Sequence, residues 1–466
     1  MGLIAPLKAF VIPFAIWLTM LYCVVYGMSR KAEWSVYLFA ILAPLPSLWY
    51  PTHQFLFGKD TMDLLFLSAA VGMWVQGKRS PSPQGRLILA CILYSYLSLW
   101  IVSFYFDFPA PVTLANPVLA DWKNYAIMLS WFFLAQALIA SEVHARVLMN
   151  IMLGVLLFLC WREISGFAAG SSFSWSRRAE GPFWIVGLNS NHFGAFVAQT
   201  GLLCLGLAAY EARRSRRWLL YTATLLSLYP LQYSYSRGAY LGFLAGLFVL
   251  CLLRYRTLLV IAVVMLLFWD TVLPESVVDR ISMTGGGEDG ALEESAALRI
   301  VMWELARDIF SSKPVFGIGF QGFYYASIGQ PLHNVHNYFL QTAAEQGVVG
   351  IILLGCTLLL GVFTGFRLWL RAPTPFLKGM GLGVLGYAVC VAVVNVFGDR
   401  YSQLALGSYF FLLLGASVRM LRNSQQAVAP VPAPFPVRRR PPPPVPSGPP
   451  EVLDAVSHTV AGGQHA

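Results

Sequence analysis

Long apolar runs recur along almost the whole chain, and short polar stretches separate them. Each run has about 17–25 residues, enough for a helix to cross the hydrocarbon core of a bilayer. Helices satisfy their own backbone hydrogen bonds there, so the pattern predicts an all-α integral membrane protein. Thirteen candidate spans lie at 4–26, 35–51, 62–77, 86–106, 124–141, 146–166, 189–210, 217–234, 239–254, 257–274, 346–370, 377–397 and 402–421. The first three are the least regular, and one of them is a candidate re-entrant or half-length segment.

The composition supports this interpretation. The chain has 466 residues, of which 57% are hydrophobic and 12% are charged. Soluble domains carry roughly twice that share of charged residues. The net charge of +10 would suggest nucleic acid in a soluble protein. Here much of the charge lies in short loops between apolar runs, and no basic–aromatic pattern of a nucleic-acid module occurs. We expect membrane lipids around the chain and no nucleic-acid partner.

Lysine and arginine concentrate in four loops that lie an even number of spans apart, so the loops share one side of the membrane. Short cytoplasmic loops are enriched in these residues. The four groups are Lys78, Arg79 and Arg86; Arg213, Arg214, Arg216 and Arg217; Arg254 and Arg256; and Arg367, Arg371 and Lys378. This orientation predicts a membrane domain at 1–423 that contains a periplasmic loop at 275–345.

The remaining features of composition add little chemistry. All seven cysteines fall in apolar runs without metal-type spacing, so we expect neither a disulfide nor a zinc site. The first apolar run leads into further spans and lacks a small-residue cleavage site, unlike a removable signal peptide. Proline-rich sequence at 424–466 predicts a disordered cytoplasmic tail, for which a spacer role is favoured over the alternative of partner binding.

Several cations lie on the predicted outer side, against the orientation rule. They are Arg177, Arg178, Arg237, Arg280, Arg299, Arg307, Lys313 and Arg400. The planar guanidinium of arginine suits phosphate oxygens, so an anionic ligand at the outer surface would explain them. The alternative is that some of them form ion pairs with acidic neighbours, namely Glu180, Glu288, Glu293, Glu294 or Asp399.

The predicted outer loop has structure of its own. Apolar residues recur at helical spacing and predict an amphipathic helix at about 291–311; they are Leu298, Val301, Met302, Leu305 and Ile309. Arg299, Trp303 and Arg307 share the other face. Such a helix can lie on the membrane surface and present arginines over a cavity, or that face can simply be solvated.

Two motifs follow this helix. GIGFQGF at 317–323 spells a glycine-rich pattern, but no strand precedes it, which excludes a dinucleotide site. We expect its glycines to form a tight turn or a close backbone approach. HNVHNYFLQTAAEQGVVG at 333–350 becomes helical from Asn337, and a helical wheel places His336, Gly347 and Gly350 on one face, with Glu345 pointing away. The glycines would then let another helix approach beneath the histidine. A histidine there can accept a proton from a sugar hydroxyl, although a lone histidine is more often structural.

These residues resemble a known family. His336-Asn337 followed by Gly347 and Gly350 resembles the H-[NSQ]-x9-G-x-x-G signature of bacterial O-antigen ligases and protein O-oligosaccharyltransferases. Three further stretches resemble the superfamily, which includes Wzy-type polymerases. They are 178–196, with Arg178, Asn191 and His192 at matched positions; 236–246, with its Ser-Arg-Gly; and 299–323, with its arginine, tryptophan and glycines. The first 170 residues resemble the family only in hydropathy.

The resemblance implies a GT-C-like fold with twelve spans in the inner membrane of a Gram-negative bacterium. It implies a metal-independent and cofactor-free glycosyltransferase acting at the periplasmic face. The donor would be an undecaprenyl-pyrophosphate-linked glycan and the acceptor lipid A-core, in lipopolysaccharide biosynthesis. His336 would be the general base. Arg237, Arg299 and Arg178 would bind the pyrophosphate, with Asn191 and His333 beside them. A single displacement would invert the anomeric configuration.

The sequence leaves alternatives open. A Wzy-type O-antigen or exopolysaccharide polymerase and a protein O-oligosaccharyltransferase would share this chemistry and differ only in the acceptor. A polysaccharide transporter or flippase belongs to another class. Transporters often show internal repeats and charged groups near the membrane midplane. This chain shows no clear repeat, and its ionisable residues gather at the outer edge, which favours the enzyme.

Overall fold

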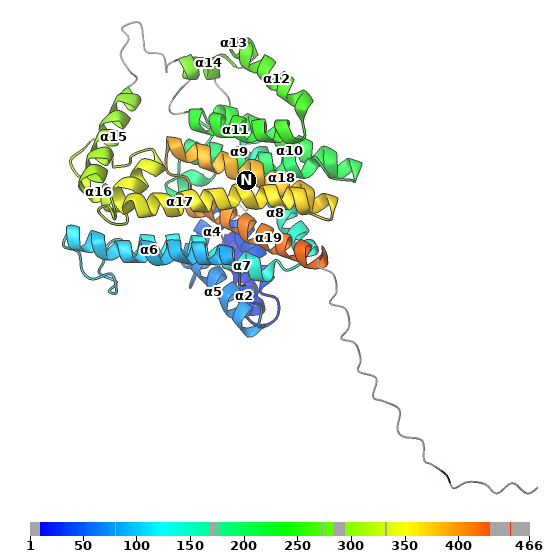
Figure 1. Ribbon diagram of the computed structural model, residues 1–466, viewed down its shortest axis with the longest axis horizontal. Coiled ribbons are helices and arrows are strands. Elements are labelled where there is room, and N and C mark those ends of the chain that lie inside the picture. The colour runs from blue at the N-terminus through cyan, green and yellow to red at the C-terminus, as the bar shows by residue number, and fades with distance from the viewer. Residues whose placement is uncertain are drawn as a thin grey trace, which may run out of the picture. The chain divides into compact units, whose positions relative to one another are not determined.

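The computed structural model describes residues 10–79, 81–166, 174, 177–272, 274–282, 294–330, 333–428 and 448. Every regular element in these ranges is a helix, which confirms the predicted all-α class (Figure 1). Beyond Val428 only Gly448 belongs to the described residues, so most of the predicted tail lies outside them. The predicted start of the loop helix, before Glu294, also lies outside them.

Each predicted span contains at least one helix. The elements that overlap those spans are α2 (Ile12–Ser29), α3 (Glu33–Leu42), α4 (Pro46–Trp49), η2 (Tyr50–Gln54), α5 (Thr61–Val75), α6 (Pro83–Tyr105), α7 (Leu119–Leu138), α8 (Glu142–Gly166), α9 (Ser190–Ala208), α10 (Arg214–Tyr233), α11 (Arg237–Leu253), α12 (Arg256–Leu267), α13 (Trp269–Val272), α17 (Tyr338–Arg371), α18 (Pro375–Val394), η5 (Asn395–Phe397) and α19 (Leu404–Val428). The connecting segments form η3 (Phe183–Val186), α14 (Glu275–Ser282), α15 (Glu294–Ser312) and α16 (Gly322–Ala326).

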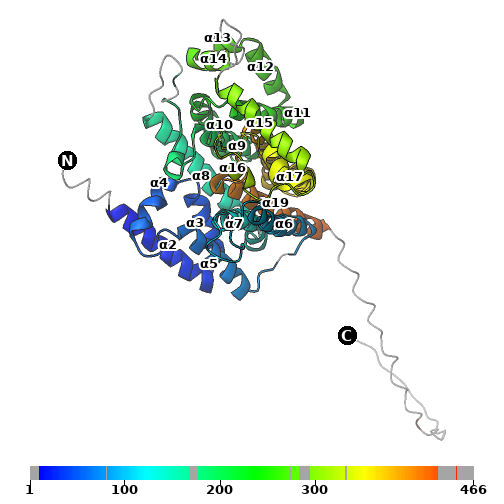
Figure 2. The same ribbon diagram turned by 90° about the vertical axis from the view of Figure 1, so that its left-hand side faces the viewer.

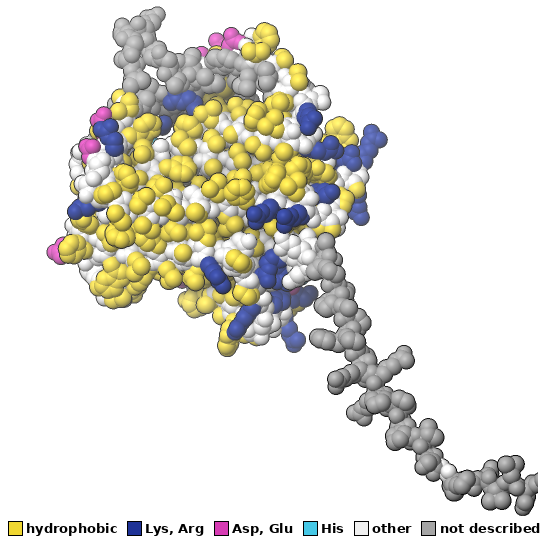
Figure 3. All heavy atoms as spheres, in the orientation of Figure 1, with side chains coloured by type: hydrophobic (Ala, Val, Ile, Leu, Met, Phe, Trp, Pro, Cys, Tyr) yellow, Lys and Arg dark blue, Asp and Glu magenta, His cyan; other side chains and the backbone are white. Residues whose placement is uncertain are grey.

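Six helices in the described residues are long and apolar enough to cross a membrane: α2, α6, α8, α17, α18 and α19. The apolar helices α3, α5 and α11 are shorter. Figure 3 shows a broad apolar face, with lysine and arginine gathered mainly along its right-hand edge. These features indicate a multi-pass membrane protein. The total of twelve spans stays a prediction.

Two predicted spans are not continuous helices. The segment at 35–51 breaks into α3, α4 and η2, because Pro44, Pro46 and Pro51 lack the backbone N–H that a continuing helix requires. The segment at 257–274 breaks at Phe268. Its first part, α12, has 12 residues and is only about 18 Å long, too short to cross the hydrocarbon core.

The helices α9, α18 and α19 form the centre of the bundle. Nearly every residue of α9 is buried, and 89% of the most apolar stretch of α19 is buried. A helix that is apolar on all sides belongs in such a position. In Figure 2 the helices α2, α3 and α5 lie on one side of this centre and α10–α14 on the other.

Close helix packing at this centre depends on small residues. A Cβ atom placed on Gly206 of α9 would lie 2.2 Å from the backbone of Gly383 in α18. Two glycines at the crossing let the helix backbones touch, as is common between membrane helices. This contact fixes α18, and with it the turn after α18 that contributes to the candidate site.

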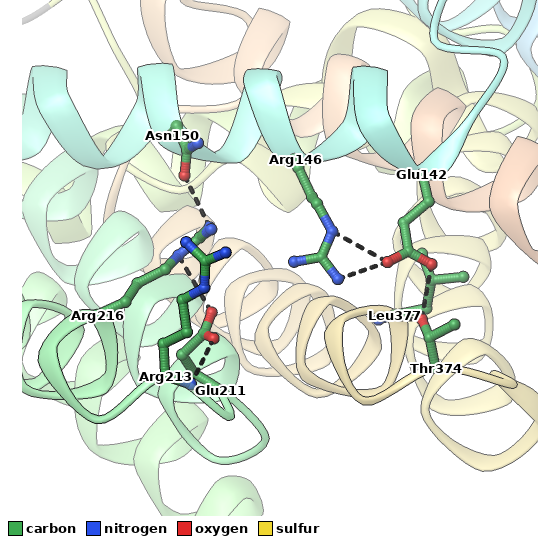
Figure 4. A network of polar contacts seen from close by, with 8 residues as sticks. All are labelled: Glu142, Arg146, Asn150, Glu211, Arg213, Arg216, Thr374 and Leu377. Atoms are coloured by element: carbon green, nitrogen blue, oxygen red, sulfur yellow. Dashed lines mark hydrogen bonds and ion pairs between the residues drawn. The ribbon is translucent and has the colours of Figure 1, made fainter.

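Polar contacts join several helices at the end of the bundle that is predicted to be cytoplasmic (Figure 4). The Glu142 carboxylate accepts hydrogen bonds from Arg146 at 2.6 Å and from the Thr374 hydroxyl at 2.8 Å. Arg216 donates to Asn150 at 2.7 Å and pairs with Glu211 at 3.1 Å. Part of the positive charge at this end therefore also connects α8 with α10 and α18.

Candidate active site

The signature histidine lies just before helix α17. Asn337 caps the helix, and its side-chain oxygen accepts hydrogen bonds from the backbone N–H of Phe339 (3.0 Å) and Leu340 (3.1 Å). His336 has a φ of +53°, in the left-handed region that few residues other than glycine adopt. The Asn334 side chain stabilises this conformation by accepting a 2.7 Å hydrogen bond from the His336 N–H. The imidazole is therefore held in a fixed, sparsely populated backbone conformation, as is common at functional sites.

Helix α15 packs directly against this segment. Its Met302 and Ala306 are buried against Val335 and Ala344 in a small apolar core. The indole of Trp303 donates a 2.9 Å hydrogen bond to the Val335 carbonyl, next to His336. Part of the apolar face of α15 thus covers the start of α17. Trp303, predicted to share the outward face, instead connects the two segments and brings Arg299, one turn earlier, towards His336.

The wheel that placed His336, Gly347 and Gly350 on one continuous helical face is wrong. His336 precedes the helix, and Gly347 (φ 62°, ψ −161°) forms a kink inside α17. At that kink the backbone of the glycine-rich segment contacts the helix, with hydrogen bonds from Ile318 N–H to the Ala344 carbonyl (3.0 Å) and from Gly319 N–H to the Glu345 carbonyl (2.7 Å). A Cβ on Gly347 would lie 2.2 Å from the Val315 oxygen. Gly347 therefore admits the backbone of the turn at Val315, not a neighbouring helix.

Arg178 is fixed by contacts with the start of α9 and the end of α10. Its guanidinium donates to the Ser234 carbonyl (2.6 Å) and to the Asn191 side chain (2.9 Å). Asn191 lies in the first turn of α9, and Ser234 ends α10. The two residues predicted from the 178–196 stretch are thus in contact, and Asn191 orients the arginine.

Arg400 lies in the turn between η5 and α19 and is only 6% exposed. The Asn395 side chain fixes the turn by accepting 2.9 Å hydrogen bonds from the N–H groups of Arg400 and Tyr401. The His192 Nε2 lies 3.1 Å from the Asp399 carbonyl oxygen, while its Nδ1 takes part in capping α9. His192 therefore connects the start of α9 to the turn that positions Arg400.

Electrostatics show that these groups occupy one neighbourhood. Burial, together with the positive charges of Arg299 and Arg400, lowers the pKa of His336 to about 4, from an ordinary value of 6.5. Burial also lowers the pKa of Arg400 to about 10; Asp399 opposes this shift, while the charges of Arg299 and Arg178 add to it. Arg299 and Arg400 thus act on His336, and Arg299 and Arg178 act on Arg400. At neutral pH the site combines three guanidinium cations with a neutral imidazole.

Two other predicted site residues, Arg237 and His333, have surroundings that differ from those of Arg299 and Arg400. Arg237 is the first residue of α11, and its neighbour Gly238 packs against Phe397, three residues before Arg400. The Arg237 backbone therefore lies near the base of the Arg400 turn, and binding of pyrophosphate by its side chain stays a prediction. The His333 imidazole contacts the Ser327 carbonyl at 3.1 Å and packs against the Tyr324 ring at 5.4 Å. These contacts suit a residue that fixes the loop around α16.

Two further outer cations, Lys313 and Arg307, lie beside other groups. Lys313 lies 5.4 Å from the ring centroid of Tyr105, and Arg307 is an exposed side chain 3.9 Å from Asp308. Asp399 was one of the acidic residues named as a possible ion-pair partner, and its charge does stabilise the charged form of Arg400. Glu288 and Glu293 lie outside the described residues.

The sequence placed Arg400 among the outer cations and His192 at a matched position, but it assigned neither of them to the pyrophosphate site. Arg400 was visible as a cation in an outer turn, but nothing in its local sequence connects it to His336. The contact between His192 and Asp399, which helps to position the Arg400 turn, joins residues 207 positions apart in the chain. The useful signal was the charge itself, because an arginine between two strongly apolar helices needs a buried anion or an anionic ligand.

Comparisons with known proteins now extend this picture. Candidate polysaccharide ligases from Rickettsia felis (26% identical, over 35% of this chain and 45% of the relative) and from Rickettsia prowazekii (25%, over 35% and 46%) are similar to this chain. The chain thus spans a little under half the length of these relatives. A solved chain from "Structural coordination of polymerization and crosslinking by a peptidoglycan synthase complex" aligns with 74% of this chain and 98% of its own, with 20% identity and a TM-score of 0.40.

Residues 222–355 match the family model described as O-antigen ligase. This stretch includes Arg237, Arg299 and His336, all of which the sequence had assigned to the site, and it covers the kink at Gly347. The match and the two curated relatives confirm the resemblance that the motifs indicated. Through this region, the chain is similar to the O-antigen ligase family.

Proposed function

We propose that the protein is a metal-independent O-antigen ligase in a GT-C-like membrane fold. It transfers an undecaprenyl-pyrophosphate-linked glycan to a sugar hydroxyl of lipid A-core at the periplasmic face of the inner membrane. One observation carries the proposal: a neutral imidazole lies close enough to Arg299 and Arg400 to feel their charges, and Arg178 in turn acts on Arg400. A base beside a strongly cationic site suits a reaction in which a hydroxyl loses its proton and a pyrophosphate leaves.

The reaction is a single displacement, in which one bond to the anomeric carbon forms while another breaks. The acceptor oxygen attacks the anomeric carbon while its proton passes to His336. The bond between that carbon and the pyrophosphate oxygen breaks, and undecaprenyl pyrophosphate leaves with both bonding electrons. Arg299 and Arg400, with Arg178 and the predicted Arg237, stabilise the negative charge that develops on the leaving group. The protonated His336 then returns its proton to solvent, and the anomeric configuration is inverted.

The position of the site supports an outer-face reaction. His336 stands at the start of α17, and Arg371 stands in the last turn of this 34-residue helix. The basic loop with Arg367, Arg371 and Lys378, which is predicted to be cytoplasmic, therefore lies at the end of α17 far from His336. The other members of the cluster come from segments that the orientation rule places on the outer side.

Reconstitution tests the proposal. Purified protein in liposomes is supplied with undecaprenyl-pyrophosphate glycan and lipid A-core, with and without EDTA. We expect the glycan to appear on lipid A-core in both cases. Chains that lengthen on the carrier instead would indicate a polymerase. Movement of the donor across the bilayer without transfer would indicate a transporter.

The donor should change the pH dependence of the reaction. Burial, together with the charges of Arg299 and Arg400, lowers the pKa of His336 to about 4 in the free protein, and a bound pyrophosphate would neutralise those two charges. The part of the shift that the arginines cause should therefore be lost in the complex, and the pKa of His336 should rise. Because the base must be neutral, activity falls on the acid side of that pKa. The acid limb of kcat, which reports the complex, should lie at higher pH than that of kcat/KM, which reports the free enzyme. Coincident limbs would contradict this coupling.

A further inference from the structure

A second cavity opens near the candidate active site. Its volume is about 550 Å³, within the range of small-molecule sites in proteins. The walls come from η2, the start of α5, the start of α7, the turn before α16 and the turn before α19. All of these ends are predicted to lie on the outer side. The mechanism proposed above uses none of the cavity's side chains.

The lining differs in charge from the arginine cluster. Its ionisable groups are three carboxylates, two ammonium groups and one imidazole, from Asp60, Asp63, Asp121, Lys59, Lys123 and His53. Lys123 pairs with Asp63 across the cavity wall. No excess of positive charge is present, so the cavity does not suit a pyrophosphate.

The other lining groups are amides and aromatic rings. Asn124, Gln321 and Gln403 offer both hydrogen-bond donors and acceptors, and the rings of Tyr125 and Phe320 lie 5.4 Å apart. A sugar hydroxyl both donates and accepts, so carboxylates, amides and ammonium groups can all bind it. The apolar faces of sugar rings pack on aromatic side chains. A neutral saccharide fits this combination of groups better than an anion or a hydrocarbon chain does.

Two lining side chains carry buried polar atoms that need a partner. Neither Trp49 Nε1 nor His53 Nε2 has a hydrogen-bond partner within the described part of the chain. Such groups usually find a partner, because leaving a buried polar atom unsatisfied costs free energy. A ligand hydroxyl or the water that it displaces would provide one.

The cavity and the arginine cluster share one turn. Ser402 and Gln403 line the cavity, and both bind the Asp399 carboxylate, through the Ser402 N–H at 3.0 Å and the Gln403 amide at 3.4 Å. Arg400 follows Asp399 in the same turn. A saccharide in the cavity is therefore separated from the predicted leaving-group site by residues 399–403, and its end can extend past this turn towards His336.

We propose that this cavity binds the acceptor glycan through its neutral sugar residues, an assignment that rests on the proposed transfer reaction. The Asp60 and Asp121 carboxylates accept hydrogen bonds from sugar hydroxyls. Lysine and amide groups donate to others. The donor pyrophosphate occupies the arginine cluster on the other side of the turn.

Asp60→Asn and Asp121→Asn test this assignment in the full-length protein. Each change keeps the side-chain shape and removes a charged hydrogen-bond acceptor. We expect the KM for lipid A-core to rise roughly tenfold or more, with kcat and the KM for the undecaprenyl-pyrophosphate glycan nearly unchanged. Asn124→Trp, which fills the cavity, should have the same effect without changing charge. Asp308→Asn is the matched control, because Asp308 is an exposed carboxylate on α15. An increase in the donor KM instead, or no change in either KM, would overturn the proposal.

A binding measurement separates this proposal from the proposed reaction. Core oligosaccharide released from lipid A-core by mild acid is titrated calorimetrically into the protein without donor. Wild-type protein should bind it, and Asp121→Asn should bind it at least tenfold more weakly. If transfer proves independent of His336 while this difference persists, the cavity remains a saccharide site and only the reaction assignment fails. Equal binding by wild type and Asp121→Asn, or no binding by either, would refute the site.

Discussion

Replacing His336 with asparagine is expected to lower the rate of glycan transfer by roughly 10²–10⁴-fold, the usual contribution of a positioned general base. Asparagine is the suitable replacement because residue 336 has a φ of +53°, a conformation that asparagine tolerates better than alanine. The fold should survive while the proton acceptor is lost. The measurement is kcat in the reconstituted system, together with an apparent melting temperature to show that the protein remains folded.

His144→Asn provides the control for this experiment. His144 lies at the start of α8, where its imidazole contacts Ser141, far along the chain from the signature motif. We expect wild-type turnover from this variant. If His336→Asn also retained wild-type turnover, the imidazole would not be the base, and the proposed mechanism would have to be abandoned.

The second large effect is expected at the kink in α17. Gly347→Ala would place a Cβ 2.2 Å from the Val315 oxygen, on a residue whose φ and ψ are 62° and −161°. That backbone region is essentially restricted to glycine. We expect a loss of about 3 kcal/mol or more in the free energy of unfolding. The apparent melting temperature in detergent should fall, and transfer should fall with it, because the start of α17 carries His336.

Gly355→Ala is the matched control within the same helix. A Cβ at Gly355 would meet nothing within 4 Å. Alanine has a higher helix propensity than glycine, so this variant should be as stable as the wild type, or more stable by up to about 1 kcal/mol. If Gly347→Ala melted at the same temperature as Gly355→Ala, the backbone contact at the kink would not matter for stability.

The helices could be predicted because an apolar run long enough to span a bilayer has few other ways to satisfy its backbone hydrogen bonds there. The break at 35–51 was also readable, since Pro44, Pro46 and Pro51 cannot donate backbone hydrogen bonds within a helix. The kink at Gly347 could not be read in this way. A glycine inside an apolar pattern is compatible with an ordinary helix, and only the approach of Val315 from another segment decides its conformation.

The candidate site was predictable only in part, for a similar reason. The motif identified His336, and the unusual outer charge identified Arg178 and Arg299. Arg400 is placed near them by the hydrogen bond that its backbone N–H donates to Asn395 and by the contact between His192 and Asp399. Such contacts join distant segments and leave no local pattern in the sequence.

The repulsion among Arg178, Arg299 and Arg400 has a consequence for the lifetime of the protein in the cell. The charges of Arg178 and Arg299 disfavour the charged form of Arg400, and an anion bound beside Arg400 would offset this cost to the folded state. A ligand that binds only the folded state shifts the folding equilibrium towards that state. The lipid-linked donor should therefore act as a stabiliser of its own enzyme. Cells that stop making the donor should degrade the protein faster, so that enzyme abundance follows substrate supply without a dedicated regulator.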